Sequence, residues 1–212
     1  RSYQPEQFRS MKCAMSLDGW VYYRLTGSLV EEPSQAAGSY LFDIRRWEWS
    51  RELCETVGIQ LDQLPQTVPY GDLVGYPTEE FRALTGISSR TSVVMAGGDT
   101  HCCGIGSAGH EVGQAYASLG STAPVQLITP EPTIDPQKRM WTGCFPLDHK
   151  WVLESNSGLC GTTFDWLARS VLRITTEDGV DYERFDQLAK PAPSGSKDVH
   201  AFLGPSIMDA RY

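Results

Sequence analysis

Long apolar stretches are missing from this sequence of 212 residues. No run approaches the roughly 18 apolar residues that a membrane-spanning helix needs, so we expect no membrane partner. Basic clusters are missing as well: 18 Lys and Arg residues stand against 26 Asp and Glu residues, for a net charge of −8. This balance argues against a nucleic-acid partner, because proteins that bind nucleic acids concentrate positive charge on one surface.

The six cysteines show neither the spacing of a disulfide framework nor that of a zinc site. They stand among apolar or small residues, which favours buried free thiols and a reducing, cytoplasmic compartment. His101-Cys102-Cys103 with His110 could suggest a metal site. Adjacent cysteines, however, do not converge on one ion as a Cys-x-x-Cys pair does, and no second ligand pair follows. We therefore expect no metal held by these side chains.

Two nucleotide-binding motifs are absent or out of place. No Gly-Lys-Ser or Gly-Lys-Thr occurs, so the sequence has no Walker loop. The segment Gly104-Ile105-Gly106-Ser107-Ala108-Gly109 matches the dinucleotide pattern G-x-G-x-x-G, which must directly follow a strand and open a helix. Here an apolar run ends well before it, at Ala96, and an extended segment follows it. Close packing of small residues explains these glycines better than a dinucleotide does.

The apolar share of 41% and the charged share of 21% are those of an ordinary globular protein. Helical spacing and capping residues predict helices over residues 17–25, 50–58, 78–86, 161–172 and 182–190. The apolar run 92–96 predicts a strand buried on both faces, and 31–38 a polar loop. Residues 114–154 are typical of an antiparallel meander, and 199–203 of a last strand.

The segment 93–125 carries the residues best suited to chemistry. Its first apolar run ends in Gly97-Gly98-Asp99, which places a carboxylate at the end of a strand, where open α/β sheets bind ligands. The glycines would let a substrate approach the backbone closely. Asp99 could serve there as a general base, or it could simply cap the following helix with its side-chain oxygen. These residues by themselves leave both interpretations open.

A second apolar run leads to Gly120-Ser121-Thr122. Backbone N–H groups in such a turn can form an anion nest, and the two hydroxyls can add donors toward phosphate oxygens. The simpler interpretation is an ordinary hairpin loop. Gly161 precedes a predicted helix, so free N–H groups there could receive a phosphate, although every helix start offers such groups.

Several short segments follow one another in a fixed order. They are Leu17 to Gly27, Pro33 to Asp43, Trp49 to Gly58 with Leu64-Pro65, Ala96 to Asp99, Leu119 to Ser121, and Gly161 to Leu167. In that order they resemble the "KDYLxxxLTG", "D-x-S-x-A-S…LFD", "W…ELL…GI…LP", "GGGD", "LGTS" and "GG…WL" segments of the FGGY carbohydrate kinases. Each match is weak singly, but the ordered set runs along nearly the whole chain.

The resemblance implies an α/β protein with the actin-like (ribonuclease H-like) ATPase fold and parts of two domains. Residues 1–110 would form the C-terminal part of the first, sugar-binding domain. Residues 111–212 would form the N-terminal part of the second, nucleotide-binding domain. The implied reaction is the ATP-dependent phosphorylation of a sugar or a sugar-like polyol, with ATP and Mg²⁺ as cofactors.

The resemblance also implies roles for single residues. Asp99 matches the family's general base, which would accept the proton of a sugar hydroxyl while that hydroxyl attacks the γ-phosphate in line. Asp99 and Thr100 would lie at the substrate. The nucleotide would contact the residues that match the family's phosphate turn and helix start, namely Gly120, Ser121, Thr122 and Gly161.

Two departures from the family pattern have consequences. Thr100 stands where the family often has Gln or Asn to hold the sugar, which leaves the substrate class open. The chain starts without Met and lacks the family's N-terminal "D-x-G-T" hairpin, so we expect a central fragment with little or no kinase activity of its own. A non-catalytic binding domain of the actin-like fold and an unrelated small-molecule binding domain remain as alternatives. A homodimer is also left open.

Overall fold

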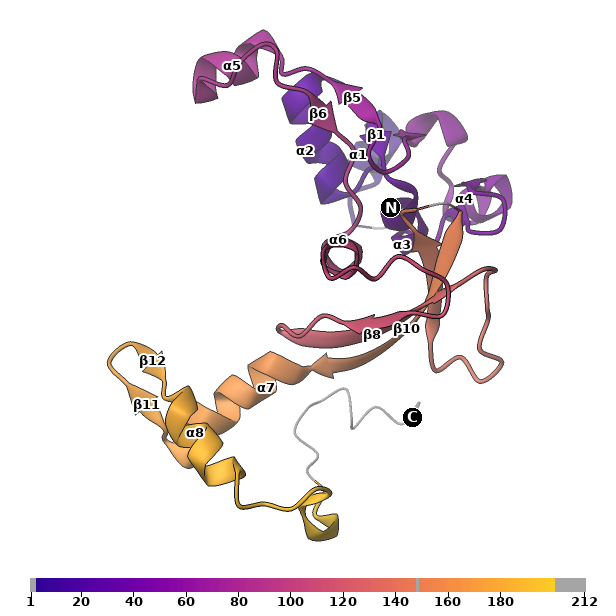
Figure 1. Ribbon diagram of the computed structural model, residues 1–212. Coiled ribbons are helices and arrows are strands. Elements are labelled where there is room, and N and C mark those ends of the chain that lie inside the picture. The colour runs from indigo at the N-terminus through magenta and orange to yellow at the C-terminus, as the bar shows by residue number, and fades with distance from the viewer. Residues whose placement is uncertain (1–2, 148, 201–212) are drawn as a thin grey trace. The chain divides into compact units, whose positions relative to one another are not determined.

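The computed structural model describes residues 3–147 and 149–200 (Figure 1). The chain divides into two units. Unit 1 comprises Arg1–Tyr116 and Gln126–Glu154, and unit 2 comprises Ala117–Val125 and Ser155–Tyr212. Asp99 therefore belongs to unit 1, whereas Gly120 and Gly161 belong to unit 2.

Short helices make up much of unit 1. They are α1 (Pro5–Ser10), α2 (Leu17–Thr26), α3 (Pro33–Gly38), α4 (Arg51–Val57), η1 (Leu61–Gln63), α5 (Glu79–Thr85) and α6 (Asp99–Gly106). Between them run strands of two or three residues: β1 (Val30–Glu31), β2 (Phe42–Asp43), β3 (Glu48–Trp49), β4 (Gln66–Thr67), β5 (Leu73–Gly75) and β6 (Val93–Val94). β1 pairs with β4 in parallel, while β2–β3 and β5–β6 are antiparallel pairs.

Three of these helices confirm the predictions over residues 17–25, 50–58 and 78–86. At their starts, a side-chain hydroxyl accepts a hydrogen bond from the backbone N–H three residues later, at Ser16, Ser50 and Thr78. At their ends, a glycine adopts the left-handed conformation that costs other residues energy, at Gly27, Gly58 and Gly86.

The polar loop predicted over residues 31–38 is wrong, because α3 occupies most of it. Pro33 stands at the first helical position, where its missing N–H costs nothing. Glu32 caps the helix: its Oε2 accepts hydrogen bonds from the N–H groups of Ser34 (2.7 Å) and Gln35 (3.4 Å). A carboxylate directly before proline is a helix-start signal that the polar composition of the segment concealed.

The strand predicted over residues 92–96 is real but shorter, and it is not buried on both faces. β6 covers only Val93 and Val94, and Val94 is 51% exposed because β6 pairs with β5 alone. Burial begins one residue later, at Met95, which packs with Tyr22 and Val30. The core therefore lies under the end of the strand rather than on both of its faces.

The largest sheet contains β7 (Ala115–Ala117), β8 (Thr122–Thr129), β9 (Trp141–Phe145) and β10 (Lys150–Leu159). Its strand order is β7-β8-β10-β9, so β10 lies between β8 and β9 (Figure 1). The prediction of extended segments over 114–154 is confirmed, but the strands do not follow the sequential order of a meander. Ile128, Phe145 and Val152 from three of these strands form a buried cluster, which Ile105 of α6 also contacts.

Unit 2 is built on helices after the sheet. They are α7 (Cys160–Trp166), the π-helix η2 (Leu167–Leu172), α8 (Tyr182–Ala189) and the short η3 (Ser196–Asp198). The helices predicted over 161–172 and 182–190 are thus confirmed. Phe164 of the first contacts Phe185 of the second, with the rings tilted and their centroids 4.2 Å apart. The hairpin of β11 (Thr175–Thr176) and β12 (Gly179–Val180) was not predicted. The strand predicted over 199–203 lies mostly outside the described residues.

All six cysteines are free thiols, as predicted. Only Cys54 and Cys144 are buried, however, and Cys103 and Cys160 are exposed, so the prediction of general burial is wrong. The exposed thiols lie on the short helices α6 and α7.

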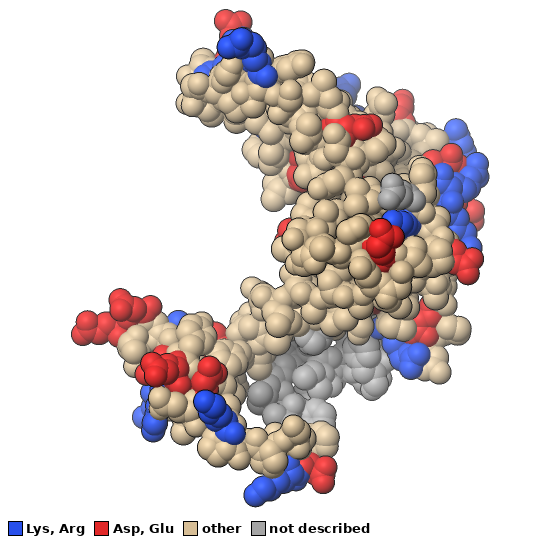
Figure 2. All heavy atoms as spheres, viewed as in Figure 1, with Lys and Arg blue, Asp and Glu red and all other residues tan. Residues whose placement is uncertain are grey.

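Charge is distributed in the way that the sequence suggests. On the face shown in Figure 2, Lys and Arg alternate with Asp and Glu and form no continuous basic surface. In the described part of the chain, no helix combines the length and the apolar character that crossing a membrane requires.

Candidate functional site

Gly97 begins the turn that carries Asp99, and its surroundings explain why it is glycine. A Cβ atom at Gly97 would stand 2.7 Å from Cγ of Pro146, the residue after β9. The turn is held from its other end by Tyr22 of α2, whose hydroxyl accepts a hydrogen bond from the N–H of Ala96 at 2.8 Å. Cys102 adds a weak thiol contact to the carbonyl oxygen of Gly97 at 3.3 Å. The turn is thus fixed by α2, α6 and the loop after β9.

Gly98 is the buried N-cap residue of α6. A Cβ atom here would lie 3.1 Å from Nδ1 of His101 and 3.6 Å from the side-chain amide of Gln35 on α3. Both neighbours would have to move for any larger residue. The Gly-Gly pair therefore allows α3, the loop after β9 and the first turn of α6 to approach one another.

Asp99 is the first residue of α6, and its side chain is exposed. Its Oδ1 atom accepts a hydrogen bond from the N–H of Thr100 at 2.7 Å. The cap position belongs to Gly98, which makes no side-chain cap, so the interpretation of Asp99 as the cap residue does not hold. What remains is an accessible carboxylate on the first turn of a helix, next to the partly buried Thr100.

His101 lies two residues beyond Asp99, and both of its ring nitrogens are buried without a hydrogen-bond partner among the described residues. Its ring makes an edge contact with Phe145 of β9, with ring centroids 6.2 Å apart. Burial lowers the pKa of His101 to about 4, so the imidazole is neutral at neutral pH. The first turn of α6 thus joins an exposed carboxylate to a buried neutral ring.

A buried carboxylate supports the neighbouring helix α3. Glu32 has no exposed surface, and burial raises its pKa to about 7, against the opposing effect of its hydrogen bonds from Ser34 and Gln35. Glu31 is buried beside it, and Oε2 of Glu31 accepts a hydrogen bond from the N–H of Ser16 at 3.0 Å. These groups hold the start of α3 and α2 in place, close to the turn that presents Asp99.

Two of the three glycines of the G-x-G-x-x-G segment, Gly104 and Gly109, have the predicted packing role, whereas Gly106 has open space around it. Gly104 lies in the second turn of α6, where a Cβ atom would overlap the ring of Tyr116. A Cβ atom at Gly109 would also stand 3.1 Å from that ring. The segment ends a helix rather than opening one, so it lacks the backbone arrangement that a dinucleotide requires.

In unit 2, the structure brings Gly120, Ser121 and Gly161 into contact. Gly120 and Ser121 are exposed in the loop between the neighbouring strands β7 and β8, which confirms the hairpin interpretation of this segment. The N–H of Gly161 donates a hydrogen bond to the carbonyl oxygen of Gly120 at 3.1 Å. A Cβ atom at Gly161 would overlap that oxygen, so only glycine allows α7 to begin against this turn.

The turn is also open on the side away from Gly161. Gly120 has no neighbouring atom where a Cβ would stand, and Ser121 is exposed. Thr122, the first residue of β8, is half-buried, and the N–H of Gly120 points to its carbonyl oxygen at 2.9 Å. A phosphate group could therefore approach Gly120 and Ser121 without displacing a side chain.

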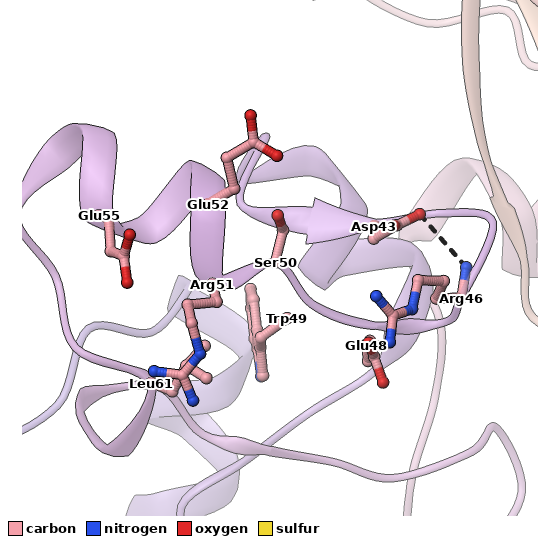
Figure 3. Close-up of a pocket in the computed structure, with 9 residues that line it drawn as sticks. All are labelled: Asp43, Arg46, Glu48, Trp49, Ser50, Arg51, Glu52, Glu55 and Leu61. Atoms are coloured by element: carbon pink, nitrogen blue, oxygen red, sulfur yellow. Dashed lines mark hydrogen bonds and ion pairs between the residues drawn. The ribbon is translucent and has the colours of Figure 1, made fainter.

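One surface hollow of about 710 Å³ is lined by none of these residues (Figure 3). It is formed by β2, β3, α4 and η1, and its lining residues are Asp43, Arg46, Glu48, Trp49, Ser50, Arg51, Glu52, Glu55 and Leu61. Charges within it pair with each other, as in the 2.8 Å ion pair of Arg46 with Glu48. It contains none of the predicted site residues.

Comparison with known proteins now adds to this geometry. Residues 1–106 match the model of the N-terminal domain of the FGGY family of carbohydrate kinases. YoaC of Bacillus subtilis, which is named as a candidate sugar kinase, is 32% identical over 187 residues, covering 88% of this chain and 38% of YoaC. The xylulose kinase of Bacillus subtilis is 33% identical over 122 residues, covering 58% of this chain and 24% of that enzyme.

A solved structure gives the fold. The gluconate kinase of Lactobacillus acidophilus superposes with a TM-score of 0.78 at 23% identity, covering 92% of this chain and 39% of that enzyme. The chain belongs to the FGGY family of carbohydrate kinases, as its motifs predicted. Its fold is the mixed α/β, actin-like (ribonuclease H-like) ATPase fold of that family. It spans about two fifths of the length of YoaC and of the gluconate kinase.

Some predictions remain untested by these findings. The division at residue 110 into sugar-binding and nucleotide-binding parts stays a prediction, and so do the roles of the named site residues. Nothing in the sequence pointed to Gln35, and His101 was considered only as a metal ligand. Gln35 lies in a segment that was predicted to be a loop. For His101, no periodicity in the sequence indicates that a histidine side chain will lack a hydrogen-bond partner.

Proposed function

We propose that the protein phosphorylates a hydroxyl group of a sugar or a sugar-like polyol with ATP, and that Asp99 is the general base. The observation that carries the proposal is the position of Asp99. Its carboxylate is exposed at the start of α6, directly after two glycines that let α3 and the loop after β9 pack against the turn. Membership in a family of carbohydrate kinases supports the same reaction.

Asp99 is suited to accept a proton. Oδ1 is held by the N–H of Thr100, which orients the carboxylate and leaves Oδ2 free to accept a hydrogen bond from a substrate hydroxyl. As that hydroxyl becomes bonded to phosphorus, its proton passes to Asp99. A phosphoryl transfer of this kind has a loose transition state, so the proton moves late and a carboxylate is a sufficient base. Because Asp99 is exposed, it can release the proton to solvent afterwards.

The phosphates of ATP would be held by Gly120, Ser121, Thr122 and Gly161. The exposed turn offers the backbone N–H of Ser121 and the hydroxyls of Ser121 and Thr122, and the absence of a side chain at Gly161 keeps α7 against it. ATP supplies the phosphoryl group when it is bound. In the described part of the chain, no group of three His, Cys, Asp or Glu residues could hold a metal ion, so we assign Mg²⁺ to the nucleotide phosphates.

The names of the relatives indicate a class of substrate but no particular substrate. Xylulose and gluconate, the substrates in the names of two relatives, are both chains of carbons with several neighbouring hydroxyls. A molecule of that kind offers one hydroxyl to Asp99 and others to polar side chains nearby. We propose this class without choosing one member of it.

The test replaces Asp99 by Asn in the protein expressed at its native length. We expect phosphorylation of the preferred substrate to fall by roughly 10²–10⁴-fold, because the amide cannot take the proton. Affinity for ATP should be unchanged. The measurements are a coupled ADP-release assay for turnover and calorimetric titration for ATP binding.

Asp62→Asn is the matched control, since Asp62 is another exposed aspartate of unit 1 and lies on η1. It should retain full turnover. Unchanged turnover in Asp99→Asn would refute the general-base assignment. The substrate itself can be found by a thermal-shift screen of pentuloses, hexonates and polyols, because a ligand that binds the folded protein raises its melting temperature.

A further inference from the structure

Two polar side chains beside Asp99 have no partner in the described part of the chain. The ring nitrogens of His101 are buried and make no hydrogen bond. The side-chain amide of Gln35, on the facing helix α3, is half-buried and likewise makes no hydrogen bond there. Together they present donors and acceptors that no described residue of unit 1 satisfies.

Gly98 places these two side chains on one side of the turn. A Cβ atom at Gly98 would lie within 3.1 Å of Nδ1 of His101 and within 3.6 Å of both Cδ and Nε2 of Gln35. The two groups therefore flank the Cα atom of Gly98, one residue before the proposed base Asp99. Because Gly98 has no side chain, both groups can lie this close to the turn.

An unpartnered buried imidazole calls for an explanation, because it destabilises the fold. A buried polar group that lacks its hydrogen bond loses its hydration without compensation, and an apolar ring of the same shape would avoid that loss. The apolar contact with Phe145 would suit a phenylalanine at this position as well as a histidine. The neutral ring, kept so by its low pKa, is nevertheless able both to donate and to accept.

We propose that Gln35 and His101 bind the substrate, taking hydrogen bonds from hydroxyls adjacent to the one that Asp99 deprotonates. This inference rests on the proposed function and extends it, since it names side chains that select a substrate with at least two neighbouring hydroxyls. The side-chain amide of Gln35 makes no hydrogen bond among the described residues, so it can rotate to meet a ligand hydroxyl and thereby uncover Nδ1 of His101.

This assignment also accounts for Thr100. The short side chain of Thr100 has no amide with which to hold a sugar. Gln35, on a different helix but beside the same turn, supplies an amide within reach of the same space. A glutamine offers both a donor and an acceptor, which suits the hydroxyl of a polyol.

The experiment uses His101→Phe and Gln35→Leu in the protein expressed at its native length, with xylulose, gluconate and related polyols as probes. We expect each variant to raise KM for the preferred probe by about tenfold, since each removes one hydrogen bond to the substrate. KM for ATP and kcat should change little. His101→Phe should be at least as stable as the wild type in urea, because it removes buried polar atoms that lack partners.

Monodeoxy analogues of the preferred probe make the test specific. The analogue that lacks the contacted hydroxyl cannot form the hydrogen bond that the variant has lost. Wild type and variant should therefore have the same KM for this analogue. A merely structural role would raise KM for every analogue alike. His110→Phe is the matched control, because His110 is an exposed histidine in the loop after α6.

Three outcomes decide between the proposals. Raised KM values that disappear with one monodeoxy analogue support the inference. Unchanged KM values in both variants of an active kinase overturn it and leave the proposed function intact. If the wild type phosphorylates no probe and no polyol shifts its melting temperature, the proposed function fails and this inference fails with it.

Discussion

The two glycine turns of this chain are built in different ways. At Gly97-Gly98, side chains from other elements close in: Pro146 stands against Gly97, and Gln35 and His101 stand against Gly98. At Gly120-Ser121, the close neighbour is backbone, because Gly161 hydrogen-bonds the carbonyl oxygen of Gly120 directly. The first turn is thus enclosed by side chains, and the second is formed by main chain.

This difference suits the two ligands that we propose. A turn lined by side chains can change its preference through single substitutions, as recognition of different sugars requires. A turn formed by main chain offers the backbone N–H of Ser121 whatever the side chains are, as recognition of an invariant phosphate requires. Substitutions around Gly97-Gly98 should therefore alter substrate specificity, whereas substitutions around Gly120-Ser121 should alter the fold of the turn.

The largest effect is expected where a side chain would meet backbone. Gly161→Ala places a Cβ atom on the carbonyl oxygen of Gly120, which cannot move without displacing the β7–β8 loop. We expect the free energy of unfolding of unit 2 to fall by about 1–3 kcal/mol, and ATP binding to weaken with it. Urea denaturation and calorimetric ATP titration measure the two effects.

Gly106→Ala is the control for that substitution. Gly106 lies in α6 with open space around its Cα, so alanine should be neutral or should stabilise the helix by up to about 1 kcal/mol. If Gly161→Ala is as stable as the wild type, the Gly120-Ser121 turn does not require the close approach of Gly161.

An effect of comparable size, but dependent on pH, is expected from Glu32, which supports the Gly97-Gly98 turn and not the Gly120-Ser121 turn. Burial raises its pKa to about 7 in the folded chain, above the unfolded value of 4.5. The folded state therefore retains a proton that the unfolded state releases. Its contribution to stability is complete below about pH 4.5 and is lost as the pH rises through 7, by an amount on the order of 3 kcal/mol.

Glu32→Gln should remove this pH dependence, since the amide oxygen can still accept the N–H groups of Ser34 and Gln35 without a charge. The free energy of unfolding is measured by urea titration at pH 5 and at pH 8. Between these pH values it should fall less in Glu32→Gln than in the wild type. Glu52→Gln, at an exposed position on α4, should leave the difference unchanged. If the free energy of unfolding of the wild type rises from pH 5 to pH 8 by the same amount as that of Glu32→Gln, the raised pKa of Glu32 is contradicted.

The smallest effect is expected at Ser121. Its hydroxyl is exposed, and the backbone of the turn remains when the side chain is shortened to alanine. We expect KM for ATP to rise by about threefold or less, because one exposed hydrogen bond contributes little. A loss of ATP binding in Ser121→Ala as large as in Gly161→Ala would mean that side chains, rather than main chain, form the second turn.

Much of the local structure was predictable because its signals are local. Hydroxyl residues at helix starts and glycines at helix ends mark α2, α4 and α5 in the sequence itself. The missed helix α3 carried the same kind of signal in Glu32 and Pro33. The order of the strands in the main sheet was not predictable, since a strand's own residues do not say which neighbours it pairs with.

Asp99, Thr100 and the Gly120 turn could be selected from the sequence as candidates, because motif order and residue type identify them. The sequence by itself also determined the family of the chain. Only the tertiary structure decided which residues surround these motifs. Gln35 and His101 are 66 positions apart in the sequence, and they flank Gly98 only because α3 packs against the first turn of α6. Long-range contacts of this kind depend on packing, which no short pattern of residues encodes.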